Sequence, residues 1–295
     1  MDLQAVGASA TIALLCAVLF ACAAKGWHFV TRVIAGHPSF ADSIMCESAQ
    51  RFRDHLQELS RRQSVYFGAG TMFVIVYAAA SMFQVPELFA GFPRWQLYAV
   101  FATLLAALAL AGFRLVQILI DWRRVRYLHD ANLAVGHQLQ RLAGERGRVY
   151  HDVPTTAGVV DHVLAGPGGL YAVTVLARRH FRPGTVSLDE HNLTWSNAKE
   201  PVSLVEVTAG AQRLGRDLRE VAAHPIRVRS VIAVPGWEVS EQLGHHHLLV
   251  NERTLPMLRG WRSREDFLLD EDVDAVHAAL SARCARGQRR ALKKD

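Results

Sequence analysis

Three long apolar runs without charge restrict most strongly what this chain can fold into. Leu3 to Ala24, Gln63 to Pro86 and Trp95 to Phe113 hold 22, 24 and 19 residues without an Asp, Glu, Lys or Arg. A helix of about 20 apolar residues is long enough to cross a bilayer. The sequence therefore predicts an α-helical membrane anchor of three transmembrane helices, the first at 1–24 and the other two as a hairpin at 63–113.

The Lys and Arg residues beside these runs predict their orientation. The connection 25–63 holds six of them, whereas 86–94 holds only Arg94. Because basic loops stay on the cytoplasmic side, we expect a multi-pass protein of the inner membrane with its N-terminus outside and its C-terminal part in the cytoplasm. The start Met1-Asp-Leu-Gln4 lacks the positive charge of a secretory signal peptide, which favours an uncleaved first span.

The segments on either side of the hairpin show helical periodicity. In the loop 25–62, apolar residues recur between Ile44 and Leu59 at helical spacing with charges between them, which predicts an amphipathic cytoplasmic helix. Its polar face is either solvated or packs on the C-terminal domain. The same period at 114–145, without a Gly/Ser-rich linker, predicts a helical connector.

From residue 146 the pattern changes to short β-like runs around one amphipathic helix. This pattern indicates a mixed sheet with helical cover, in an α/β domain at 146–262 followed by a C-terminal helix and basic tail at 263–295. The helix is expected from Pro201 to about Ala222. Strands are expected at 149–153, 158–164, 169–176, 185–188, 193–195, 228–234 and 248–250.

The formal charge of +6 is concentrated at the C-terminus. Residues 283–295 hold six basic groups and one acidic group, so the remaining residues sum to only +1. Such a tail is either a solvated helix end or a contact for anionic lipid or nucleic acid. The candidate contact residues are Arg286, Arg289, Arg290, Lys293 and Lys294.

A series of motifs in the α/β part resembles the nuclease-related (NERD) domain family. The motifs are Tyr150-His-Asp-Val153, Val160-Asp-His-Val163 and Gly166-Pro-Gly-Gly-Leu-Tyr-Ala-Val173, then Gly184-x-Val186, Trp195 and Pro201. The resemblance covers about 130–260 and implies a mixed sheet similar to that of restriction endonucleases. It also implies a chemistry in which an acid on one strand and an acid-x-Lys pair on the next hold Mg²⁺ and position the attacking water.

The chain departs from this family pattern at four of its five chemical positions. Asp161 remains as the strand acid, but the Glu and Lys of the acid-x-Lys pair are replaced by Thr174 and Leu176. The family's helix Gln falls at Leu204, and the Glu of its leading helix falls at Asn132. One carboxylate binds Mg²⁺ weakly because the ion gives up its hydration reluctantly. The resemblance thus predicts a pseudoenzyme without a cofactor, in which Asp161 is only a weak candidate for a metal ligand.

Two alternatives remain open at this point. In the first, Lys199 and Glu200 in the loop before the helix join Asp161 in a rearranged site of an active, Mg²⁺-dependent nuclease. In the second, the chain is a purely structural membrane protein. The favoured hypothesis is a membrane-anchored binding or scaffold module for nucleic acid or a cytoplasmic protein, with Arg178 and Arg179 beyond the third strand as phosphate contacts.

Two other groups of residues suggest no site. The histidines at 245–247 have no Cys or carboxylate at metal-ligand spacing, and they predict a surface loop. Cys46 and Cys284 are isolated in the sequence, without the spacing of a metal motif.

Overall fold

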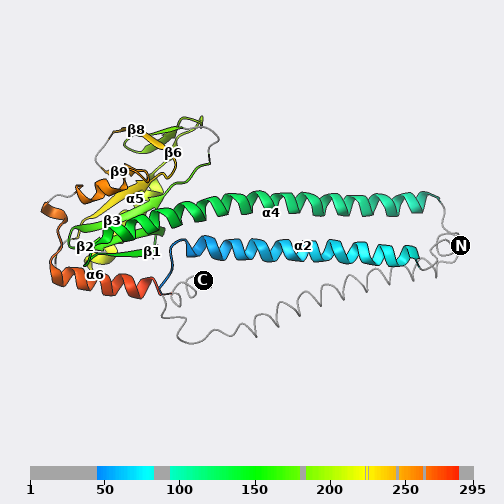
Figure 1. Cartoon of the computed structure of the whole chain (residues 1–295), viewed down its shortest axis with the longest axis horizontal. Coiled ribbons are helices and arrows are strands. Elements are labelled where there is room, and N and C mark those ends of the chain that lie inside the picture. The colour runs from blue at the N-terminus through cyan, green and yellow to red at the C-terminus, as the bar shows by residue number, and fades with distance from the viewer. Residues whose placement is uncertain are drawn as a thin grey trace. The chain divides into compact units, whose positions relative to one another are not determined.

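The chain divides into two compact units (Figure 1). A helical unit contains 1–37 and 55–124, and a sheet unit contains 38–54 and 125–295. The structure is a computed structural model that describes residues 45–82, 94–179, 184–222, 224, 226–243, 246–261 and 264–285.

Two long helices take part in both units. Helix α2 (Gln50–Met82) has 33 residues and α4 (Arg94–Ala143) has 50. Helix α2 begins in the sheet unit and continues into the helical unit, whereas α4 begins in the helical unit and ends in the sheet unit. Within the described ranges, no helix combines the length and the apolar character needed to cross a bilayer.

This finding corrects the predicted membrane anchor and, with it, the predicted multi-pass localisation in the inner membrane. The run 95–113 lies within α4 and most of 63–86 lies within α2, while 3–24 is outside the described residues. Both helices extend beyond their apolar runs into charged turns. These charges are Arg51, Arg53, Asp54, Glu58, Arg61 and Arg62 in α2, and Arg114, Asp121, Arg123, Arg124 and Arg126 in α4.

A five-stranded mixed sheet forms the centre of the sheet unit, with the strand order β1-β2-β3-β7-β9. The first three strands form an antiparallel meander, whereas β3, β7 and β9 are parallel. Parallel neighbours need a crossover connection, and the chain between β3 and β7 includes helix α5 (Val205–Arg219). The strands are β1 (Arg148–Thr155), β2 (Gly158–Gly166), β3 (Gly169–Val175), β7 (Val228–Ala233) and β9 (His247–Val250).

A second sheet of four short strands has the order β6-β5-β4-β8. Its buried side chains pack with Ile232 and Leu249 of the larger sheet. Within this cluster the rings of Trp195 and Trp237 meet edge to face, with centroids 4.6 Å apart. The strands are β4 (Thr185–Leu188), β5 (Asn192–Trp195), β6 (Val202–Ser203) and β8 (Glu238–Gln242).

Helices cover both faces of the five-stranded sheet. Alternate strand residues point to opposite faces, so the sheet contributes to two separate cores. On one face, Leu214 of α5 and Leu280 of α6 (Asp270–Arg283) pack with sheet residues such as Val163. On the other face, Leu139 of α4 packs with Tyr171 of β3 and with the 3-10 helix η2 (Leu255–Arg259). A further 3-10 turn, η3 (Arg264–Asp266), precedes α6.

The segment before α2 is part of the sheet unit. Cys46 N–H donates to the Cys284 carbonyl at 2.9 Å, and Met45 forms an isolated β-bridge with Ala285. Cys46 and Cys284, which are isolated in the sequence, are thus adjacent, buried and unoxidised. The contact of this segment with the end of α6 fixes where α2 begins, and therefore where the side chain of Arg51 lies.

Candidate functional site

Asp161, the strand acid of the NERD pattern, is buried on β2 and both of its oxygens have donors. Its Oδ2 accepts from the Val175 N–H of the neighbouring strand at 2.7 Å. Its Oδ1 accepts from Nη2 of Arg51, which belongs to the first turn of α2. Only 2% of the Asp161 side chain is exposed, compared with 32% for Arg51. The guanidinium therefore closes the carboxylate off from solvent.

A second buried carboxylate, Asp152 of β1, also contacts Arg51. Its Oδ2 accepts from the Arg51 backbone N–H at 2.8 Å, and its Oδ1 lies 3.7 Å from Arg51 Nε. Arg51 thus bridges two carboxylates through both its main chain and its side chain. We call Arg51, Asp152 and Asp161 the arginine-carboxylate cluster.

The backbone at this cluster is strained. Asp152 has φ +52° and Ala49, two residues before Arg51, has φ +61°. Left-handed conformations at residues other than glycine cost about 1–3 kcal/mol each and persist where the surrounding structure enforces them. Here the surrounding contacts include the hydrogen bond from Arg51 N–H to Asp152 and the burial of Ala49, which is 1% exposed. Such strain is typical of functional sites or of their remnants.

The pKa of Asp161 reflects burial opposed by its donors. The pKa of this carboxyl is raised from 3.8 to about 6 as the net effect of its surroundings, of which desolvation by burial is the largest. The charge of Arg51 and the hydrogen bond from Val175 lower it, and the nearby Asp152 raises it further. At neutral pH the group is therefore an ionised carboxylate paired with a cation.

The structure brings Asp161 and the acid-x-Lys positions together. His162 pairs with Val173 across β2 and β3, so Asp161 and Thr174 are the next residues along the two strands. Thr174 is partly buried. Leu176, at the Lys position, packs against the apolar cluster between the two sheets. Leu176 therefore forms an apolar contact at the position where the resemblance implies an ammonium group.

Asn132 and Leu204, which fall at two other chemical positions of the NERD pattern, are both buried. Asn132 is buried on α4, where its Nδ2 donates to the Leu128 carbonyl at 2.9 Å. Leu204 is buried at the N-cap of α5. Neither residue supplies an acidic or amide group to Asp161 in the described structure.

Lys199 and Glu200, the residues of the alternative nuclease site, lie in the turn between β5 and β6. Both are exposed. In the parts of the chain that the structure describes, neither forms a hydrogen bond or an ion pair with Asp161. The described residues also contain no group of three or more His, Cys, Asp or Glu side chains placed to hold a metal ion.

Two buried histidines each follow or precede one acid of the cluster in sequence: His151 precedes Asp152, and His162 follows Asp161. His151 Nδ1 and His162 Nδ1 are 2.8 Å apart, and His151 Nε2 lies 3.2 Å from Gln140 Nε2 of α4. Desolvation lowers the pKa of His151 to about 4 and that of His162 to about 3. Both rings are therefore neutral at physiological pH, and neither adds positive charge to the cluster.

The predicted phosphate contacts beyond β3 are at the surface. Arg178 and Arg179 are exposed, and the Arg178 carbonyl accepts from Trp237 Nε1 at 2.7 Å and from Tyr127 Oη at 3.2 Å. These bonds fix the backbone at the start of the loop. The basic tail residues Arg286, Arg289, Arg290, Lys293 and Lys294 are outside the described residues.

The sequence did not identify Arg51 as a site residue. The available signal was the amphipathic pattern around it, which left packing on the C-terminal domain open. His247 was also missed: a surface loop was expected, but this side chain is only 4% exposed and hydrogen-bonds Ser230 Oγ at 2.8 Å. His246 is exposed, and His245 is outside the described residues.

Comparison of the chain with protein-family models, with curated proteins and with solved structures found no match. The chemistry of the site is therefore argued from its own residues.

Replacing Arg51 tests the energetic role of the cluster. Arg51→Met keeps the aliphatic stem but leaves the buried Asp161 unpaired, so we expect a loss of about 3 kcal/mol in unfolding free energy at pH 7, the lower end for buried pairs because Arg51 is partly exposed. Chemical denaturation measures the loss. The matched control is Arg53→Met, whose exposed pair with Glu47 is worth less than about 1 kcal/mol. The double variant Arg51→Met/Asp161→Asn should recover part of the loss seen in Arg51→Met. Equal losses in Arg51→Met and Arg53→Met would contradict a role of Arg51 in stabilising the buried carboxylates.

Asp161 also predicts a pH dependence of stability. Because its folded pKa of about 6 lies above the ordinary value of 3.8, its protonated form stabilises the fold below pH 4, and this contribution is lost as pH rises through 6. The unfolding free energy of the wild type minus that of Asp161→Asn should fall by roughly 1–3 kcal/mol between pH 4 and pH 7. The buried histidines His151 and His162 have lowered pKa values, so their contribution to the unfolding free energy changes with pH in the opposite direction. Both proteins contain these histidines, so their contribution cancels in the difference. A flat difference curve would show that burial does not raise this pKa.

Proposed function

We propose that this chain is a nuclease-related binding module without metal-dependent cleavage activity. The contact between Arg51 and Asp161 carries the proposal. In the chemistry that the NERD resemblance implies, the strand carboxylate neutralises Mg²⁺. Here a guanidinium already neutralises the carboxylate, and a divalent ion would have to displace it.

The residues beside Asp161 also lack the groups for hydrolysis. Thr174 offers a neutral hydroxyl and Leu176 offers no polar atom, so the position of the acid-x-Lys pair has neither a second anionic ligand nor an ammonium group. Arg51 cannot take the role of a base because its guanidinium stays protonated in proteins. Binding without cleavage is the function that these side chains support.

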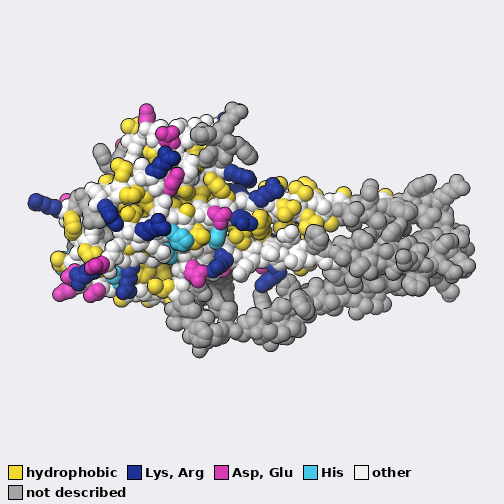
Figure 2. All heavy atoms as spheres, viewed as in Figure 1, with side chains coloured by type: hydrophobic (Ala, Val, Ile, Leu, Met, Phe, Trp, Pro, Cys, Tyr) yellow, Lys and Arg dark blue, Asp and Glu magenta, His cyan; other side chains and the backbone are white. Residues whose placement is uncertain are grey.

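Nucleic acid is the ligand that we propose for this module. Arg178 and Arg179 are exposed just after β3, the strand that carries Thr174, and arginine matches phosphate geometry. On the face seen in Figure 2, basic and acidic side chains of the described residues are interspersed. The contact is therefore local, with few phosphates, and does not use an extended basic surface. A protein partner is the alternative outcome of the binding test below.

The nuclease assay uses the full chain with plasmid or single-stranded DNA and Mg²⁺ or Mn²⁺. We expect no cleavage above background, because the strand acid Asp161 is held by Arg51. Gel electrophoresis of the DNA over time provides the readout. Cleavage that disappears in Asp161→Ala would overturn the proposal and establish the alternative of an active nuclease with a rearranged site.

The binding assay measures the affinity of the full chain for a fluorescent single-stranded oligonucleotide as salt is raised. Neutralising Z phosphate contacts gives a slope of about −0.7Z in a log–log plot for single strands. We expect a shallow slope. The double variant Arg178→Gln/Arg179→Gln should lower the number of phosphate contacts Z obtained from this slope by about 1–2. Arg123→Gln/Arg124→Gln on α4 is the control for charge alone. No binding at low salt would remove nucleic acid and favour a protein ligand.

A further inference from the structure

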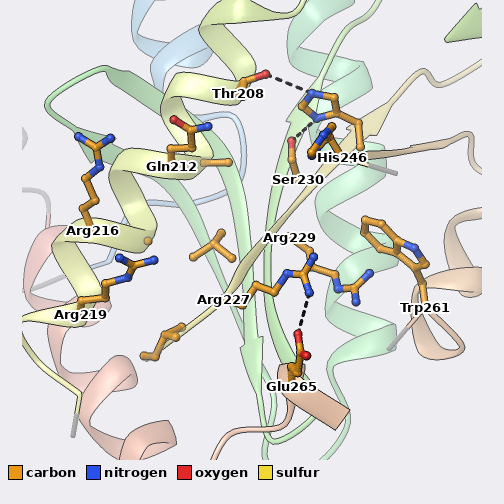
Figure 3. A pocket seen from close by; sticks show the side chains of 15 residues that line it. Thr208, Gln212, Arg216, Arg219, Arg227, Arg229, Ser230, His246, Trp261 and Glu265 are labelled. Carbon is orange, nitrogen blue, oxygen red and sulfur yellow. Dashed lines mark hydrogen bonds and ion pairs between the residues drawn. The ribbon is translucent and has the colours of Figure 1, made fainter. Parts of the chain in front are cut away.

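A cavity of about 990 Å³ lies between α5 and the edge of the five-stranded sheet (Figure 3). It exists because β9 is short. The pairing of β7 with β9 begins at Ser230 and His247, so Val228 and Arg229 of β7 extend past the start of the edge strand. The size is at the upper end of the range of small-molecule pockets, about 300–1,000 Å³.

Helix α5 forms one wall of this cavity. Thr208, Gln212, Arg216 and Arg219 all line it, because residues three or four positions apart share one helix face. The glycine at 215 lets the helix approach the sheet closely: a Cβ there would lie 3.3 Å from Val228 Cγ2. The close contact at Gly215 therefore fixes the distance between α5 and β7, which line the cavity.

The opposite wall carries Arg227, Arg229 and Trp261 (Figure 3). Arg229 is already engaged, since its guanidinium pairs with the buried Asp266 at 2.6 Å and lies 4.6 Å from the centroid of the Trp261 ring. Arg227 pairs with Glu265 at 3.2 Å, but both of these side chains are exposed. An exposed pair of this kind is worth about 0–1 kcal/mol, so Arg227 can exchange it for an anion.

Polar, neutral side chains form the inner end of the cavity. His247 Nδ1 lies 2.8 Å from Ser230 Oγ, and His247 Nε2 lies 3.1 Å from Thr208 Oγ1. Thr208 Oγ1 also donates to the Leu204 carbonyl at 2.9 Å, which makes His247 Nε2 the donor to Thr208 and Ser230 the donor to Nδ1. Burial lowers the pKa of His247, so the ring stays neutral in this chain of hydrogen bonds.

The cavity carries an excess of positive charge. Four arginines and one glutamate line it. Arg216 and Arg219 are exposed, and neither pairs with an acidic side chain among the residues that the structure describes. Unpaired guanidinium groups on one wall and an exchangeable one on the other are suited to an anion with several oxygens.

We propose that this cavity binds the phosphate group of a nucleotide, either free or at the end of a nucleic-acid strand. Arginine presents a planar fork of donors that matches phosphate oxygens, and the volume accommodates a nucleoside beside the phosphate. This inference rests on the proposed function, in which the chain binds nucleic acid without cleaving it. It adds a site on α5 and β7, separate from Asp161 and from the surface around Arg178.

The test compares two arginines of the same helix. Arg219 lines the cavity, whereas Arg213 is exposed on α5 and does not. Calorimetric titration of the full chain at low salt uses inorganic phosphate, adenosine 5′-monophosphate and a 5′-phosphorylated single-stranded oligonucleotide as probes. Arg219→Gln should weaken binding at least about 10-fold, because a charge-assisted hydrogen bond is lost. Arg213→Gln should change it less than about 2-fold.

The probes distinguish the two sources of the phosphate. Tighter binding of the mononucleotide identifies a free nucleotide, and tighter binding of the oligonucleotide identifies a strand end. The site is overturned if no probe binds the wild type, or if Arg213→Gln weakens binding as much as Arg219→Gln does. The first result would also remove nucleic acid as the proposed ligand, whereas the second leaves the proposed function standing when DNA remains uncut. Asp161-dependent cleavage would overturn the proposed function whatever this cavity binds.

Discussion

The ion pair between Arg51 and the buried carboxylates of Asp152 and Asp161 is the interaction on which the rest of the sheet unit depends. A carboxylate buried without a partner would cost several kcal/mol, and Asp161 is paired with Arg51, which lies outside the central meander. The cation comes from 110 residues earlier in the chain. The buried acids of β1 and β2 are therefore paired only when the start of α2 is docked against these strands.

The same ion pair neutralises the buried acids with a group of the chain itself. A divalent ion and a guanidinium can both neutralise acidic side chains, but only the guanidinium is covalently held and always present. The neutral hydroxyl of Thr174 and the apolar side chain of Leu176 fit beside acids that are already paired. Leu176 gains contacts with the cluster between the two sheets.

Local pattern predicted the strands of this fold better than its long-range contacts. The predicted runs at 149–153, 158–164 and 169–176 correspond to β1, β2 and β3 within two residues at each end, because alternation and glycine turns are local signals. The helix predicted from Pro201 begins only at Val205, since 202–203 pair with β5 as β6. Strand β8 was not predicted, because its residues are mostly exposed and show no apolar alternation. Arg51 is a site residue only through tertiary structure, which a single sequence does not show.

The continuity of α2 has a mechanical consequence. Arg51 is the second residue of a helix that continues without a break to Met82, so its guanidinium moves with the helix as part of a rigid rod. A slide of one turn, about 5.4 Å, or a rotation of one residue, about 100°, would carry the guanidinium out of reach of both acids. The two carboxylates would then be left facing each other without a cation. The protonation of Asp161 thus depends on the position of the first turn of α2.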